Sequence, residues 1–186
     1  AKAPAKHREP LSGVIAALHK ELRLFEERAV AVGVNLREGP PAFTCHAYVQ
    51  FLMATAYQCS YAEGYAVLYA AEKAYHDSWK VVRKGLNPES PWMPFVENWA
   101  GEAFAAYVAY LETELDGLAR EAGEGERARM AELFVLATRY EIAFWGKLFY
   151  PWAVLVMMAL ALPFAYLHVR AGGVSFKIFT GVMIGV

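Results

Sequence analysis

Two glutamates, Glu72 and Glu141, occupy positions where the sequence predicts buried helix faces. Each is set in an apolar stripe at helical spacing. The first stripe consists of Tyr65, Leu68, Tyr69 and Trp79. The second consists of Leu133, Phe134, Ala137, Tyr140, Phe144 and Leu148. Because an unpaired buried carboxylate is costly or takes up a proton, both positions need a physical reason.

General acid–base catalysis on a flat, polar ring is one such reason. Aromatic walls stack the ring, and desolvation raises the pKa of one carboxyl group toward neutrality. The alternative is structural: each glutamate accepts a hydrogen bond from a tyrosine hydroxyl or pairs with a lysine. The spacing leaves both alternatives open.

Other chemically active residues are less promising. Cys59 could be a nucleophile, but no histidine stands at a recognisable spacing from it. The histidines form no HxxxH or HxxE pair, so we expect neither a metal ion nor an organic cofactor. The net charge of −1 argues against binding to nucleic acid.

The elements that position the two glutamates are all predicted to be helices. A first helix has Pro10 in its first turn and ends at Gly33. Its apolar face consists of Leu11, Val14, Ile15, Leu18, Leu22 and Phe25. A second helix begins near Thr44.

Ser60 and Glu63 form a capping box that opens a long helix to about Lys84. The string "GLNPESP" ends this helix. A further helix carries Phe104, Tyr107, Val108, Leu111, Leu115 and Leu118 at core spacing. The polar string "EAGEGERA" is expected to be a loop, and the last amphipathic helix begins at about Ala128.

Three ordered strings carry a family resemblance: "TCHAYVQFLMATAYQCSYAEGYAVLYAAEKAYHDSW", "PWMPFVENWAGEAFAAYVAYLETELD" and "FVLATRYEIAFW". Over about residues 11–145 the chain resembles the TenA (thiaminase II) family. The resemblance implies an all-α, haem-oxygenase-like helical bundle over residues 1–147. It also implies hydrolysis of an aminomethyl-pyrimidine from thiamin breakdown, which returns hydroxymethyl-pyrimidine to thiamin salvage.

The resemblance also assigns roles to single residues. One branch of the family has a catalytic cysteine in the long helix, and this chain has Glu72 there, as in the glutamate branch. The second acid of the family corresponds to Glu141 in the "YE..FW" string. Tyr48, Tyr75 and Trp99 correspond to substrate-binding positions, although Trp99 stands where the cysteine branch has tyrosine. The resemblance implies no cofactor.

The beginning of the chain departs from the family pattern. The family begins with helices that carry a "QDY"-like string, whose aspartate binds the amino group of the pyrimidine. This chain starts after that string, so we expect an N-terminally truncated bundle that lacks this aspartate.

The last part of the chain departs as well. From about Thr138 the sequence is similar to lipopolysaccharide-export permeases of the LptF/LptG type. No charge interrupts residues 148–169, which are long enough to span a bilayer as a helix. We therefore expect residues 148–186 to form an apolar, transmembrane-like helical tail; a core helix that replaces missing ones is the alternative.

Three functions remain open from the sequence. The first is a cytoplasmic hydrolase in which Glu72 and Glu141 share the acid and base roles. The second is a fragment of an inner-membrane permease that contacts lipid through its tail. The third is a truncated bundle that catalyses nothing. A homo-oligomer is compatible with each of them.

Overall fold

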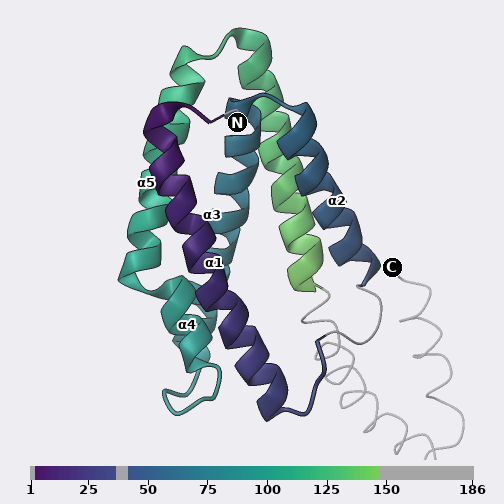
Figure 1. Cartoon of the computed structure of the whole chain (residues 1–186), viewed down its shortest axis with the longest axis vertical. Helices are drawn as coiled ribbons and strands as arrows, with labels where there is room; N and C mark the ends of the chain where they lie inside the picture. Colours follow the sequence, from purple (N-terminus) through teal and green to yellow (C-terminus); the bar gives the residue numbers. More distant parts are fainter. Residues whose placement is uncertain (1–2, 37–41, 147–186) are drawn as a thin grey trace, which may run out of the picture. The chain divides into compact units, whose positions relative to one another are not determined.

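The structure is a computed structural model, and it describes residues 3–36 and 42–146. Five helices are α1 (Ala5–Ala31), α2 (Phe43–Gln58), α3 (Tyr61–Gly85), α4 (Met93–Ala100) and α5 (Glu102–Glu121) (Figure 1). A further helix runs over residues 124–146. The described residues contain no strand, in agreement with the predicted all-α class.

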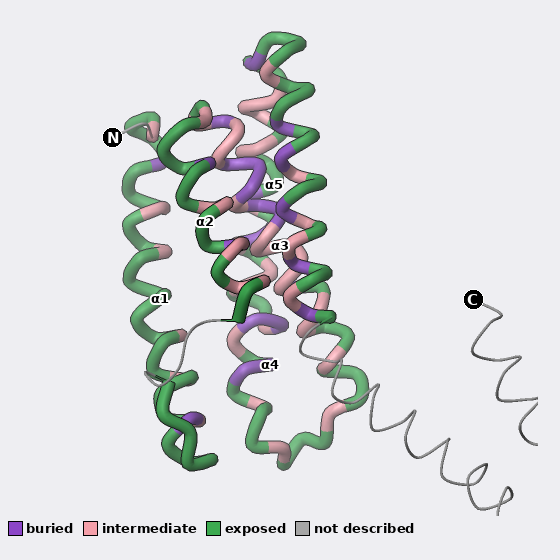
Figure 2. The backbone as a smooth tube through the Cα atoms, turned by 90° about the vertical axis from the view of Figure 1, so that its right-hand side faces the viewer, coloured by how far each residue is buried: buried purple, intermediate pink, exposed green. Residues whose placement is uncertain are grey.

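Helix α3 is the centre of the packing, because it contacts α2, α4 and α5. Tyr65 and Tyr69 of α3 form a buried cluster with Val108 and Leu111 of α5. In Figure 2, buried positions gather on α3 and the helices that face it, whereas α1 is exposed along most of its length. The stripe predicted around Glu72 is thus in the core.

The helix over residues 124–146 packs on another face of α3. Its Met130 joins the cluster of Ala62 and Ala66, and its Leu133 and Ala137 join Val67 and Ala70. Small residues on α3 allow this close approach. The second predicted stripe therefore faces the core at Leu133 and Ala137, and Glu141, one turn later, is buried too, while Leu148 lies outside the described residues.

Two predicted helix ends are confirmed at atomic detail. The Ser60 side chain accepts a hydrogen bond from the Glu63 backbone at 3.2 Å, and the Ser60 backbone donates to the Glu63 carboxylate at 2.8 Å. Helix α1 ends with Gly33 at a φ of 70°. The next residue, Val34, donates its N–H to the Ala29 carbonyl at 2.8 Å, which completes a Schellman motif.

The predicted start of α1 is wrong. Pro10 lies inside the helix, which begins at Ala5. Proline has no N–H for the carbonyl four residues earlier, so a helix normally starts near it. Here the turn before Pro10 is held by the tertiary contacts of His7, whose side chain is only 1% exposed.

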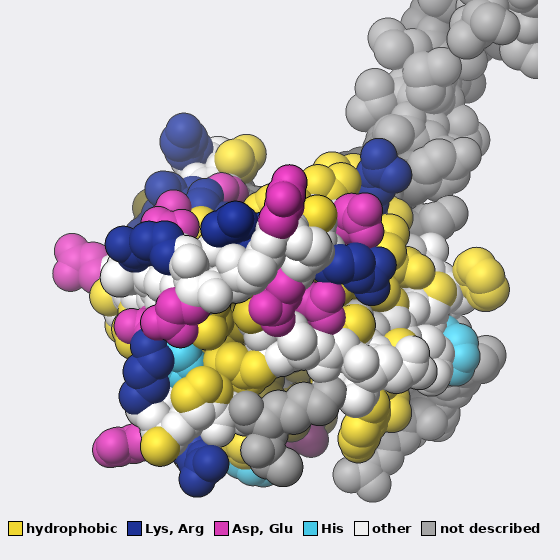
Figure 3. Space-filling view, turned by 90° about the horizontal axis from the view of Figure 1, so that it is seen from above, with side chains coloured by type: hydrophobic (Ala, Val, Ile, Leu, Met, Phe, Trp, Pro, Cys, Tyr) yellow, Lys and Arg dark blue, Asp and Glu magenta, His cyan; other side chains and the backbone are white. Residues whose placement is uncertain are grey.

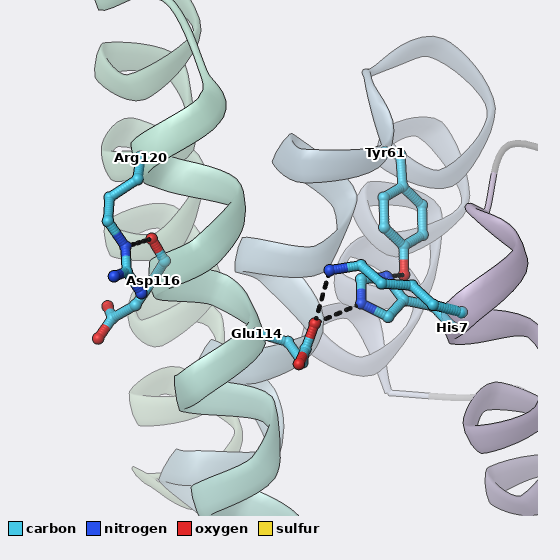
Figure 4. A network of polar contacts seen from close by, with 6 residues as sticks. His7, Tyr61, Glu114, Asp116 and Arg120 are labelled. Atoms are coloured by element: carbon cyan, nitrogen blue, oxygen red, sulfur yellow. Dashed lines mark hydrogen bonds and ion pairs between the residues drawn. The ribbon is translucent and has the colours of Figure 1, made fainter.

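His7 connects α1 to two other helices (Figure 4). Its Nε2 lies 2.6 Å from the Glu114 carboxylate of α5, and its Nδ1 lies 2.8 Å from the Tyr61 hydroxyl of α3. Lys6 forms a second ion pair with Glu114 at 3.1 Å. Hydrogen bonds from His7 and Lys6 lower the pKa of Glu114, so this carboxylate accepts and the imidazole Nε2–H donates.

The described residues leave most of the predicted apolar face of α1 exposed. Ile15, Leu18 and Leu22 are 61%, 48% and 56% exposed. Among the other helices, α1 makes its clearest contacts with α4. Periodicity predicted this stripe correctly, but it did not predict which surface would cover it.

Two further boundaries differ from the prediction. The expected loop "EAGEGERA" shrinks to residues 122–123, because the next helix already begins at residue 124. Helix α4 is an addition, because the sequence predicts no helix between the string "GLNPESP" and the helix that carries Phe104. Pro94 falls in the first turn of α4, where a missing N–H costs nothing.

A glycine makes the sharp junction between α4 and α5 possible. A β-carbon at Gly101 would lie 2.3 Å from the carbonyl oxygen of Glu97. Side chains of α3 bond the last two carbonyls of α4 before this junction: the His76 ring reaches Trp99 O at 2.7 Å, and Arg83 donates to Ala100 O at 2.8 Å. Helix α4 is thereby held against α3 through its backbone.

The chain divides into two compact units, Ala1–Ile142 and Ala143–Val186. The predicted transmembrane-like tail, residues 148–186, lies outside the described residues. Within residues 3–36 and 42–146, no helix is long and apolar enough to cross a membrane. On the described part of the face in Figure 3, acidic and basic side chains are interspersed rather than gathered into a patch of one sign.

Candidate active site

Glu141 is buried and hydrogen-bonded to a tyrosine. It is 4% exposed, and its Oε1 accepts a hydrogen bond from the Tyr48 hydroxyl of α2 at 2.7 Å. The Tyr48 ring stacks on Tyr140, with the ring centroids 5.2 Å apart and the planes 6° from parallel. Burial, followed by the charge of Glu141, raises the pKa of Tyr48. The phenol therefore keeps the proton that it donates.

Glu72 lies on α3 in a more accessible place. Its side chain is partly buried, and its Oε1 accepts a long hydrogen bond of 3.4 Å from the Tyr107 hydroxyl of α5. The pKa of Glu72 is raised to about 7. Desolvation is the largest cause, the negative charge of Glu21 is the second, and Glu141 adds a smaller increase against the lowering effect of Tyr107.

The charges of the two glutamates act on the same two tyrosines. Charges on both Glu141 and Glu72 raise the pKa of Tyr48. Tyr75, on the turn of α3 after Glu72, has its pKa raised to about 12 by burial and then by the charges of Glu141, Glu21 and Glu72. Tyr48 thus contacts Glu141 directly, and both Tyr48 and Tyr75 lie within the electrostatic range of the two predicted carboxylates.

Trp99 lies beside Tyr75 in an aromatic cluster. It is 3% exposed, and its ring meets Tyr75 edge-on, with the centroids 5.4 Å apart. It stacks on Trp79 at 5.6 Å and contacts Phe95 at 5.7 Å. Trp99 therefore supports Tyr75 from the side of α4, while direct contact between Trp99 and a substrate stays a prediction.

Sequence reasoning missed a third carboxylate. Glu21 of α1 raises the pKa of Glu72, Tyr75 and Tyr107 through its charge. Its Oε1 accepts a hydrogen bond from the Asn98 amide of α4 at 3.2 Å. The available signal was its position at the border of an apolar stripe, one turn before Phe25.

The carboxylates do not form a metal centre. Within the described part of the chain, no three His, Cys, Asp or Glu side chains are arranged to hold a metal ion. A cavity of about 300 Å³ opens one helical turn away, between Leu11 of α1, Leu52 of α2 and Leu68 of α3. Neither Glu72 nor Glu141 lines this cavity, so we place the chemistry at the carboxylates and not there.

Comparisons with known proteins agree with this fold. The profile of the TENA/THI-4/PQQC family matches residues 1–150. A crystal structure of a TenA homologue from Pyrococcus furiosus superposes with a TM-score of 0.74 at 35% sequence identity. The match covers 77% of this chain and 69% of that protein. A search against curated proteins gave no match.

Proposed function

The chain belongs to the TENA/THI-4/PQQC family, and from this premise we propose that it hydrolyses an aminomethyl-pyrimidine in thiamin salvage. The observation that supports the proposal is a pair of glutamates that each accept a hydrogen bond from a tyrosine hydroxyl, one of which, Glu72, has a pKa of about 7. A catalytic acid works best when its pKa lies near the working pH. We place the chain in the glutamate branch because Glu72 stands at the position of the catalytic cysteine.

The structural alternative accounts for only part of the site. Both glutamates accept a hydrogen bond from a tyrosine, as that alternative expects. However, the bond to Glu72 is long, at 3.4 Å, and it does not offset the desolvation of the carboxyl group. A purely structural glutamate would be expected to have a stronger partner, whereas a catalytic one must be able to exchange its proton.

Each glutamate has a distinct part in the proposed reaction. Glu72 donates its proton to the exocyclic amine nitrogen as the bond between that nitrogen and the methylene carbon breaks. Glu141 takes a proton from water, whose oxygen forms the new bond to the same carbon. The products are ammonia and the hydroxymethyl-pyrimidine, and a proton passes from Glu141 to Glu72 through solvent to restore the starting state.

The aromatic residues hold the ring in this proposal. Tyr48 fixes the Glu141 carboxylate through its 2.7 Å hydrogen bond and offers the edge of its ring to the substrate. Tyr75 forms the opposite wall, supported by Trp99. Stacking against aromatic side chains suits a flat heterocycle, and the hydroxyl groups supply hydrogen bonds for its ring nitrogens.

The test is turnover by the full chain. We expect release of ammonia and hydroxymethyl-pyrimidine from an aminomethyl-pyrimidine, and a loss of roughly 10²–10⁴-fold in Glu72→Gln and in Glu141→Gln. The control is Glu27→Gln, which removes an exposed glutamate of α1. If either site variant keeps activity within a few-fold of the parent chain, that glutamate is structural.

A further inference from the structure

We propose that the cavity between α1, α2 and α3 is a second binding site, which takes a small, largely apolar alcohol with the Tyr65 hydroxyl as its polar anchor. The cavity measures about 300 Å³, which lies at the lower end of the range for pockets that hold small molecules. Neither Glu72 nor Glu141 lines it, so the proposal does not depend on the proposed hydrolysis.

The wall of the cavity is mostly apolar. Its apolar side chains come from three helices and are Leu11 of α1, Leu52 and Ala56 of α2, and Val67 and Leu68 of α3. Because apolar surface leaves water favourably for such surroundings, this lining selects an occupant with a hydrocarbon body. The size of the cavity limits that body to a small molecule.

Helix α3 leaves room for the occupant at Gly64. This glycine lies inside the helix and lines the cavity. No described atom lies within 4 Å of the place where its β-carbon would be. A larger side chain at position 64 would therefore take up space in the cavity without a clash at the β-carbon.

The Tyr65 hydroxyl is a buried polar group that needs a partner. Tyr65 lines the cavity and is 3% exposed, and its hydroxyl oxygen has no hydrogen-bond partner among the described residues. The ring is packed in a buried cluster with Val108 and Leu111 of α5, which keeps the side chain out of water. Since an unpaired buried hydroxyl is costly, a ligand that brings a polar group to Tyr65 removes that cost when it binds.

Tyr61, one turn earlier on the same wall, has already committed its proton. Its hydroxyl lies 2.8 Å from Nδ1 of His7, whose Nε2 lies 2.6 Å from the Glu114 carboxylate (Figure 4). In the neutral imidazole the Nε2–H donates to Glu114, so Nδ1 accepts the proton of Tyr61. The Tyr61 oxygen can then only accept a further hydrogen bond.

Two more hydroxyl groups of the lining are committed in the same way. Thr55 donates to the Phe51 carbonyl at 2.9 Å, and Ser60 donates to the Glu126 carboxylate. Among the hydroxyl groups of the lining, Tyr65 is thus the one that can still donate, while the others can only accept. A ligand hydroxyl both accepts and donates, so it suits this set better than a carbonyl group, which only accepts.

Binding of cyclohexanol and cyclohexanone to the full chain tests the proposal. The two probes have the same ring, but the ketone cannot donate a hydrogen bond. Carbon-13 methyl NMR should show shifts at Leu11, Leu52 and Leu68 when cyclohexanol is added. We expect cyclohexanol to bind roughly three- to tenfold more tightly than cyclohexanone, which corresponds to one additional hydrogen bond. Equal affinities, shifts confined to other residues, or no shifts up to the solubility of the probe would each overturn the proposal.

Two variants test the anchor and the space separately. Tyr65→Phe keeps the ring and should weaken the binding of both probes roughly three- to tenfold. Gly64→Leu should fill the cavity and abolish the methyl shifts. Tyr57→Phe, which changes an exposed tyrosine of α2 outside the lining, should leave binding unchanged. Unchanged affinity in Tyr65→Phe, or unchanged shifts in a folded Gly64→Leu, contradicts the assignment, and Tyr65→Phe alone decides it if Gly64→Leu does not fold.

Discussion

Helices α1 and α3 are nearly equal in length, with 27 and 25 residues, but they are held in different ways. Helix α3 has seven buried residues, and α1 has only His7 and Ala29. The sequence shows an apolar stripe on both. Helix α3 is therefore held by burial from Ala62 to His76. Helix α1 is held at a few points, namely His7 near its start and Glu21 and Phe25 further along.

The largest expected difference between the two helices concerns packing. Leu111 of α5 is 1% exposed and packs against Tyr65 and Tyr69 of α3. Its replacement by alanine should therefore cost about 2–5 kcal/mol of unfolding free energy. Leu18→Ala on α1 should cost no more than about 0.5 kcal/mol, because Leu18 is 48% exposed. Urea denaturation of both variants measures this. Equal losses would mean that the α1 stripe is covered after all.

The next difference is in the response to pH. The pKa of Glu72 in the folded protein, about 7, exceeds the ordinary glutamate value of 4.5, so the folded state binds the extra proton. Stability should therefore decline as pH rises from 4.5 to 7, by on the order of 3 kcal/mol, and level off above that range.

Glu72→Gln should remove this decline, because the amide does not titrate. The urea midpoint, measured between pH 4.5 and pH 8, reports the change. Glu26→Gln, an exposed position on α1, serves as the control. A decline of the same size in Glu72→Gln would assign the effect to another group.

The anchor at the start of α1 should have a moderate effect. His7→Ala removes the partners of Glu114 and Tyr61 and should cost about 1–3 kcal/mol. Amide hydrogen exchange should speed up in the first turns of α1 and hardly at all in α3. His19→Ala, an exposed position on the same helix, is the matched control. Protection that is unchanged in His7→Ala would show that the anchor does not hold α1.

The smallest expected effects on stability come from two glycines, one inside α1 and one just after it, and they have opposite signs. Gly33→Ala should cost about 1 kcal/mol, because Gly33 has a φ of 70°, a region that alanine avoids. Gly13→Ala, inside the helix and with nothing within 4 Å of the new β-carbon, should stabilise by about 0.5–1 kcal/mol. Thermal unfolding of the two variants should move in opposite directions, and parallel shifts would contradict this account of the helix end.

Local signals predicted the sites that depend on a single helix. The capping box at Ser60 and the glycine at position 33 require only neighbours along the chain, and both are confirmed. The inward positions of Glu72 and Glu141 followed from periodicity, because a buried face fixes the direction of every side chain on it.

Local sequence signals could not predict features that depend on contacts between two helices. Glu21 accepts a hydrogen bond from Asn98 only because α1 lies against α4, and no spacing in the sequence encodes that contact. The early start of α1 depends in the same way on partners of His7 more than fifty residues away. The apolar stripe on α1 is the opposite case: its helical periodicity was predicted correctly, but the described residues leave it largely exposed.

The junction at Gly101 has a consequence for how this chain tolerates change. A substitution that introduces a β-carbon must displace the Glu97 carbonyl, which is part of the backbone of α4 and cannot turn aside as a side chain could. A saturation library at position 101 should return almost only glycine. Extra residues inserted there would also pull the Trp99 and Ala100 carbonyls from His76 and Arg83. An affinity tag or a new chain terminus would be better accepted in the exposed turn at Pro88 and Glu89.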